Sequence, residues 1–154
     1  MANDFAGTTV IDRPVGEVFA FLADGTNDPQ FSPRVQSIEK KTDGPVGVGT
    51  VYESTVKDAG MTTQREFELT EFEEPSRIRW TERSQNMITV PNGGYDLEPV
   101  GDGTKLTVMN EFEGHGFGKL ILPLALRGAR KDADPFAERI KQAVESRPAS
   151  PAPS

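Results

Sequence analysis

The feature that most constrains this chain is a long series of short alternating segments separated by turn signals. From residue 34 to residue 113, apolar and polar residues alternate, with breaks at turns such as Asp43-Gly44-Pro45 and Gly101-Asp102-Gly103. Alternation of period two between turn residues is typical of β-strands joined by hairpins. Because these connections are too short for a parallel crossover, neighbouring strands should run antiparallel. We predict strands near 4–11, 34–42, 48–57, 61–73, 76–84, 87–98 and 103–113.

A helical pattern interrupts the chain between the first two strands. Apolar residues between Val15 and Leu22 recur at i, i+3, i+4 and i+7, which places them on one face of a helix. Pro14 suits the first turn, because the N–H that proline lacks would have no partner there. The segment closes at Phe31-Ser32-Pro33, so we expect short helical structure before the second strand.

A second helical pattern follows the last strand, from about Phe117 to Glu145. Pro123 and Pro135 are expected to kink or divide this helix. A curved antiparallel sheet buries such a helix against its concave side, and a cavity can remain where the two do not meet fully. The predicted buried face consists of Leu120, Leu124, Phe136, Ile140 and Val144.

The chain length indicates one domain. We place that domain at 1–146 of the 154 residues and expect 147–154, RPASPAPS, to be a disordered tail. Met1–Asp4 begins no signal-peptide pattern, which favours a cytoplasmic location. The longest apolar run, Leu120–Leu126, is much shorter than the ~20 residues that cross a bilayer. We therefore expect no stable membrane insertion.

Composition excludes several classes of partner and site. The 24 acidic and 17 basic residues give a net charge of −7, which opposes binding to nucleic acids and, overall, to anionic membranes. The chain has no cysteine and one histidine, so the usual zinc ligand sets and a thiolate nucleophile are excluded. We expect no metal site and no cofactor. The oligomeric state is left open.

Five motifs spaced along residues 5–146 resemble the motif pattern of one superfamily. They are Pro14-x-x-Glu17-Val18-Phe19-x-Phe21-Leu22-x-Asp24, Phe31-Ser32-Pro33, Gly47-x-Gly49-Thr50, Thr70-Glu71-Phe72-Glu73-x-Pro75-x-Arg77-Ile78-x-Trp80 and Gly101-Asp102-Gly103-Thr104-x-Leu106-Thr107. With these motifs, the chain resembles the polyketide cyclase/dehydrase-like branch of the START-related (SRPBCC) superfamily.

The resemblance implies a particular α+β architecture. This is the helix-grip fold of the birch-pollen-allergen type, in which a curved seven-stranded antiparallel sheet wraps around a long C-terminal helix. Two short helices follow the first strand, and a hydrophobic ligand cavity lies between the sheet and the long helix. The resemblance implies no single reaction, because its members include binders, transfer proteins and cyclases.

Strand alternation indicates Glu82 as one polar residue that could face this cavity. Ile78, Trp80 and Glu82 share one face of their strand, and the apolar pair marks the concave side. If Glu82 also points inward, desolvation raises the pKa of its carboxyl and makes it a proton donor or a partner for a polar ligand. A solvent-exposed glutamate at the strand end is the alternative.

Four further residues carry side chains suited to a site. Asn110 is the polar residue on an otherwise apolar strand face, so its amide needs a partner from the protein, water or a ligand. Tyr52 and Tyr95 present rings to the core and hydroxyls that must find hydrogen bonds. His115 lies among glycines, either as a general base or as a solvated hinge residue.

The sequence thus supports three hypotheses. The first is binding or transport of a small hydrophobic ligand such as a lipid or polyketide. The second is a polyketide cyclase or dehydratase whose catalytic candidates are Glu82, Asn110, Tyr52 and Tyr95. The third is a protein-interaction module with Leu120–Leu126 as an exposed apolar patch. The expected cavity residues are Phe19, Tyr52, Phe67, Leu69, Ile78, Trp80, Glu82, Tyr95, Val108, Asn110, Leu120, Leu124 and Phe136.

Overall fold

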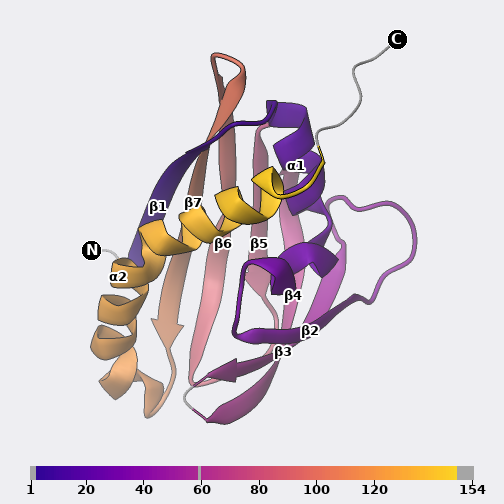
Figure 1. Cartoon of the computed structure of the whole chain (residues 1–154). Helices are drawn as coiled ribbons and strands as arrows, with labels where there is room; N and C mark the ends of the chain where they lie inside the picture. Colours follow the sequence, from indigo (N-terminus) through magenta and orange to yellow (C-terminus); the bar gives the residue numbers. More distant parts are fainter. Residues whose placement is uncertain (1–2, 59, 149–154) are drawn as a thin grey trace.

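A single antiparallel sheet forms the frame of the protein (Figure 1). The computed structural model describes residues 3–58 and 60–148, and its seven strands follow the order β1-β7-β6-β5-β4-β3-β2. Each strand lies within a few residues of its predicted position, because the turn signals mark the strand ends. The strands are β1 (Asp4–Ile11), β2 (Val35–Lys40), β3 (Val51–Asp58), β4 (Met61–Glu73), β5 (Arg77–Glu82), β6 (Ile88–Val100) and β7 (Gly103–Gly114).

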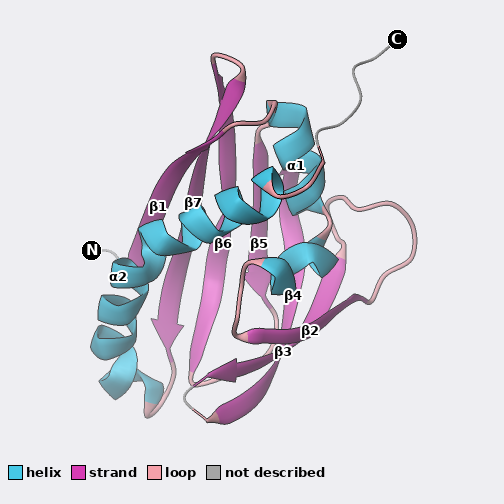
Figure 2. Cartoon of the chain, viewed as in Figure 1, coloured by secondary structure: helices cyan, strands magenta, loops and turns pink. Residues whose placement is uncertain are grey.

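Helices cover one side of this sheet (Figure 2). The two short helices expected after β1 are α1 (Val15–Ala23) and the 3-10 helix η1 (Gly25–Gln30), and the long helix is α2 (Gly118–Glu145). The α+β helix-grip fold is therefore confirmed. None of the helices in the described ranges combines the length and apolar character needed to cross a bilayer.

The long helix α2 continues through both of its prolines. The expectation was that Pro123 and Pro135 kink or divide the helix; both lie inside one helix, so they do not divide it. Figure 1 shows that α2 changes direction partway along before it crosses the sheet. Each proline removes one backbone hydrogen bond, and packing of the later turns against β1 and β7 holds the helix together.

The predicted buried face of α2 is correct only in its second half. Ile140 and Val144 are fully buried, whereas Leu120 and Leu124 are 74% and 72% exposed. Repeated steps of four residues advance by 400°, so a stripe of that spacing turns by ~40° at each step. Leu120 and Leu124 therefore face away from the sheet on which Ile140 packs, and assigning them to the buried face was wrong.

Close contact between α2 and β1 requires a glycine. A Cβ atom built on Gly7 would lie 2.1 Å from the carbonyl oxygen of Ala133 in α2. Neighbouring polar contacts fix the same crossing, because the N–H of Thr8 donates to Asp134 Oδ1 at 3.0 Å. The side chain of Thr9 also donates to Glu138 Oε1 at 2.5 Å. The helix thus lies directly on the backbone of the first strand.

We predict that Gly7→Ala lowers the free energy of unfolding by about 1–3 kcal/mol, the usual effect of overpacking. Gly16→Ala in α1 is the matched control, because a Cβ atom there would meet nothing within 4 Å and alanine favours helix. Urea denaturation of both variants measures the difference. Equal stability of Gly7→Ala and the wild type would show that the helix can move away from the strand freely.

Candidate ligand-binding cavity

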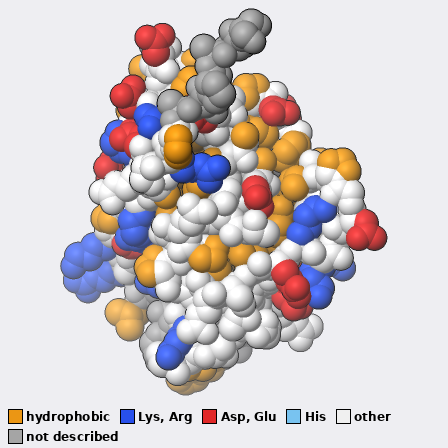
Figure 3. All heavy atoms as spheres, turned by 45° about the vertical axis from the view of Figure 1, so that its right-hand side comes forward, with side chains coloured by type: hydrophobic (Ala, Val, Ile, Leu, Met, Phe, Trp, Pro, Cys, Tyr) orange, Lys and Arg blue, Asp and Glu red, His pale blue; other side chains and the backbone are white. Residues whose placement is uncertain are grey.

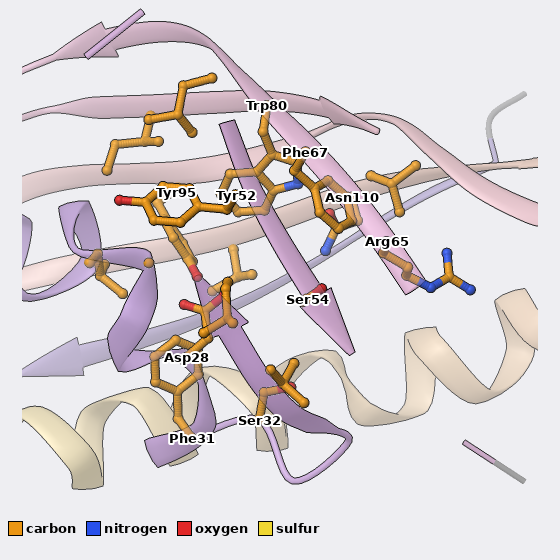
Figure 4. Close-up of a pocket in the computed structure, with 18 of the residues that line it drawn as sticks. Asp28, Phe31, Ser32, Tyr52, Ser54, Arg65, Phe67, Trp80, Tyr95 and Asn110 are labelled. Carbon is orange, nitrogen blue, oxygen red and sulfur yellow. The ribbon is translucent and has the colours of Figure 1, made fainter. Parts of the chain in front are cut away.

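A cavity of about 230 Å³ lies between the concave face of the sheet, the short helices and α2. Most of its wall is apolar, and residues from the strands, both short helices and α2 contribute to it. In Figure 4, Phe67, Trp80 and Asn110 approach from the sheet, and Asp28, Phe31 and Ser32 approach from the opposite side. The apolar part of the wall comprises Leu22, Ala23, Phe31, Val35, Ile38, Val56, Phe67, Leu69, Ile78, Val90, Val108 and Phe136.

Several polar side chains interrupt this apolar wall. They belong to Asp28, Ser32, Tyr52, Ser54, Arg65, Trp80, Tyr95 and Asn110. Within residues 3–58 and 60–148, the side chains of Asp28, Ser54, Tyr95 and Asn110 make no hydrogen bond to protein. Polar groups inside proteins are almost always paired, so these four side chains are available to bond to water or to a bound molecule in the cavity.

Asp28 is the most perturbed of these polar groups. It stands in η1, whose first turn is capped when Asp24 Oδ1 accepts a hydrogen bond from the Thr26 N–H at 3.1 Å. Burial raises the pKa of the Asp28 carboxyl from 3.8 to about 7, and the negative charge of Asp24 adds to this increase. A carboxyl with this pKa is present in both protonation states near neutral pH.

Two tyrosines share the electrostatic environment of Asp28. The Tyr52 hydroxyl of β3 donates to the Ala23 carbonyl at 3.4 Å, and its ring packs so closely on Gly25 that a Cβ there would lie 2.9 Å from Cζ. Burial raises the pKa of Tyr52, and Asp24 and Asp28 contribute to the same shift. Burial also raises the pKa of Tyr95 well above its usual value, with a further contribution from Asp28. Both phenols are therefore protonated donors at neutral pH.

A donor and an acceptor meet on the sheet wall over Gly93. Trp80 on β5 pairs with Gly93 on β6, which in turn pairs with Asn110 on β7. A Cβ atom built on Gly93 would lie 2.1 Å from Asn110 Oδ1 and 2.5 Å from Trp80 Nε1. The absence of a side chain at Gly93 thus lets the indole and the amide occupy the same part of the wall.

Glu82 does not lie on the cavity wall, although its side chain is fully buried. Its carboxylate accepts two hydrogen bonds from Arg65 Nη1 at 3.1 and 3.2 Å and one from the Val90 N–H at 3.0 Å. Ser84 Oγ and Asn86 Nδ2 also donate to it, at 2.6 and 2.9 Å. The alternative of a solvent-exposed strand end is therefore wrong, and Glu82 instead holds Arg65, which does line the cavity.

The structure separates the other predicted residues into two groups. Phe19 is buried in the core against Phe72, with ring centroids 5.2 Å apart, and does not reach the cavity. Leu120 and Leu124 are exposed on α2, so the prediction that they line the cavity is wrong for the reason given above. Those that do line the cavity are Tyr52, Phe67, Leu69, Ile78, Trp80, Tyr95, Val108, Asn110 and Phe136.

His115 stands outside the cavity. Its Nε2 lies 2.8 Å from Thr89 Oγ1 and 3.4 Å from Glu113 Oε1, and its side chain is 47% exposed. This arrangement agrees with a hydrogen-bonded surface residue between β7 and α2.

Sequence reasoning missed Asp28, Ser32, Ser54 and Arg65. Ser54 and Arg65 occupy paired positions on β3 and β4, so strand alternation could have identified them once the register was known. Asp28 and Ser32 follow α1 in a segment with neither helical nor strand periodicity, so no pattern pointed to them.

Known structures share this architecture at low sequence identity. Ara h 8.0201 is 24% identical with a TM-score of 0.70, over 96% of this chain and 100% of that one. Protein TTHA0849 from Thermus thermophilus is 18% identical with a TM-score of 0.76, over 93% and 97%. The Zhui aromatase/cyclase from Streptomyces sp. R1128 is 14% identical with a TM-score of 0.75, over 94% of both chains. These similarities show the fold.

Comparison with curated proteins gave no match. A family profile gives a more specific assignment than these structures do, because it matches the amino-acid sequence itself over nearly the whole chain. The profile described as polyketide cyclase / dehydrase and lipid transport matches residues 3–145. This range contains every strand and helix of the fold and all of the cavity wall. The chain therefore belongs to the polyketide cyclase/dehydrase and lipid transport family.

Proposed function

We propose that this protein binds a small, mostly apolar molecule that carries polar oxygen groups, and encloses it between the sheet and α2. The observation that carries this proposal is an apolar cavity in which the side chains of Asp28, Ser54, Tyr95 and Asn110 have no hydrogen-bond partner among the described residues. Apolar area supplies affinity in such sites, while a small number of placed polar groups fixes the orientation of the ligand.

The volume limits the size of the ligand. A cavity of roughly 150 Å³ takes up benzene, so a cavity of about 230 Å³ suits a compact molecule of one or two rings. A longer chain-like lipid would need the walls to move apart. We therefore favour a small cyclic ligand over an extended one.

The polar groups suit oxygen atoms at two ends of such a ligand. Trp80 Nε1–H can donate to a carbonyl or hydroxyl oxygen, and Asn110 beside it can accept or donate. On the facing wall, Asp28 accepts from a hydroxyl when ionised and donates to a carbonyl when protonated. A hydroxylated or carbonyl-bearing ring would satisfy both walls at once.

The only tryptophan of the chain reports on this site directly. Trp80 is the single Trp, so the protein gives one indole N–H signal in a proton–nitrogen correlation spectrum. We expect titration with 1-naphthol to shift this signal saturably, and titration with naphthalene to shift it with weaker affinity. Val108→Phe, which fills the cavity, should abolish both effects.

Val100→Phe is the matched control, because Val100 is exposed on β6 and does not line the cavity. It should bind 1-naphthol as the wild type does. Absence of any saturable shift in the wild type would contradict the proposal, and so would equal binding by Val108→Phe.

A second candidate function is favoured by Asp28. A carboxyl with a pKa of about 7 facing the cavity can act as a general acid or base, which contributes typically ~10²–10⁴ in rate. Tyr95 is a protonated donor for a carbonyl oxygen in the same space, whereas the Tyr52 hydroxyl already donates to the Ala23 carbonyl. These groups suit proton transfer and water loss during closure of a ring in a polyketide-like substrate.

We expect Asp28→Asn to lower turnover of a linear poly-β-ketone by about 10²-fold or more, while 1-naphthol still binds. Val100→Phe again serves as the unchanged control. Product analysis by liquid chromatography and mass spectrometry measures the turnover. Wild-type products at the uncatalysed rate would remove the enzymatic candidate and leave the binding function untouched.

A further inference from the structure

One stripe of the surface consists of large apolar residues followed by basic ones. Phe117, Leu120 and Leu124 are 67%, 74% and 72% exposed, and Arg127 and Lys131 continue the stripe in exposed positions. Successive members are three or four residues apart, so they lie on one side of α2. Phe117 precedes the first residue of α2 with helical backbone angles. The stripe extends from Phe117 to Lys131, which is about 21 Å along the helix.

This stripe faces away from the protein core. Three buried residues of the same helix, Leu126, Ala133 and Ala137, lie roughly 100–180° around the axis from Leu120 and Leu124. Folding therefore gains nothing from three large apolar side chains in these positions. Contiguous exposed apolar side chains mark surfaces that bind a partner or a membrane.

The charge of this segment is opposite to that of the whole chain. Residues 118–131 contain Lys119, Arg127, Arg130 and Lys131 and no acidic residue, although the net charge of the chain is −7. On the face drawn in Figure 3, basic and acidic side chains are interspersed. Among the described residues, neither Arg127 nor Lys131 has an ion-pair partner. The first half of α2 is thus a basic amphipathic segment.

We propose that this stripe docks the protein onto an anionic lipid surface. Phe117, Leu120 and Leu124 enter the boundary between headgroups and acyl chains, and Arg127 and Lys131 contact the anionic headgroups. A basic helix with an apolar stripe is the usual form of an interfacial anchor, and its charge is complementary to anionic lipid. The remainder of the acidic protein is repelled by the same surface, so the molecule approaches it with this end first. This inference does not depend on the ligand of the cavity.

Cosedimentation with lipid vesicles tests the inference. We expect the wild type to sediment with vesicles of phosphatidylserine and phosphatidylcholine, and to stay in solution with phosphatidylcholine alone. Arg127→Gln/Lys131→Gln should weaken binding by about thirtyfold, because each basic residue near an anionic surface contributes roughly five- to sixfold in affinity. High salt should have a similar effect. Leu120→Ser/Leu124→Ser should weaken binding by at least ~10-fold.

The control replaces exposed valines away from α2. Val48→Ser/Val100→Ser removes two exposed apolar side chains, 69% and 45% exposed, and should leave vesicle binding unchanged. Circular dichroism confirms that each variant is folded. Failure of the wild type to bind anionic vesicles would overturn the inference, as would full binding by Leu120→Ser/Leu124→Ser. A third outcome would also overturn it: the wild type self-associates and binds no vesicles, and Leu120→Ser/Leu124→Ser is monomeric. The stripe would then be a contact between copies of the chain.

Discussion

Asp28→Asn is expected to raise the free energy of unfolding at about pH 8 by up to roughly 4 kcal/mol and to leave it nearly unchanged near pH 4. The folded pKa of this carboxyl is about 7 and the ordinary value is 3.8. Between these values the folded state binds the proton more strongly than the unfolded state, so the wild type loses stability as pH rises. The loss starts near the lower pKa and is complete just above the higher one.

Asparagine carries no charge at any pH, so the variant avoids this loss. Guanidinium denaturation over a series of pH values measures the difference between the two proteins. Asp102→Asn is the control, because Asp102 is exposed in the β6–β7 turn, and its stability profile should follow that of the wild type. Parallel profiles for Asp28→Asn and the wild type would show that the Asp28 carboxyl is well solvated in the folded protein.

Glu82→Ala is expected to lower the free energy of unfolding by about 3–5 kcal/mol, because it leaves a largely buried guanidinium without its partner. Arg65 Nη1 donates to both oxygens of Glu82, and the Val90 N–H would lose its acceptor as well. Urea denaturation measures the effect. A loss of this size would show that Glu82 supports the cavity wall by holding Arg65 in place.

Two comparisons make this prediction specific. Glu66→Ala removes a solvent-exposed partner of Arg83, 3.7 Å away, and should lower stability by less than about 1 kcal/mol. Arg65→Met/Glu82→Met removes both buried charges and should recover much of the lost stability. If Glu82→Ala lowers the free energy of unfolding no more than Glu66→Ala does, the buried Arg65–Glu82 pair stabilises the protein no more than a solvent-exposed ion pair does.

Local signals predict the sheet of this protein well. Several turns between strands contain residues such as Gly101 with φ of 59° or Gly44 with φ of 88°, conformations that glycine adopts readily. Turn chemistry is therefore readable from neighbouring residues alone. Alternation assigns Ile78, Trp80 and Asn110 to apolar strand faces, and the structure places these residues on the cavity wall.

Features that depend on tertiary register were not predictable from the sequence. The partner of Glu82 is Arg65, 17 residues earlier on the adjacent strand, and only the β4–β5 register brings them together. The pKa of Asp28 is raised by burial in the cavity that Tyr52 and Tyr95 also line, and by the charge of Asp24. The segment η1 has no apolar period of its own that could have predicted this burial. The faces of α2 were mistaken because a spacing of four residues drifts around a long helix.

The depth of the cavity is sensitive to the residue at position 93. The indole of Trp80 and the amide of Asn110 approach each other over this residue. One added methyl group would push both side chains inward, and the space for a ligand would shrink without any change in the aromatic residues. A substitution at this one position would therefore change the volume and the polar lining of the cavity while the sheet and α2 stay the same.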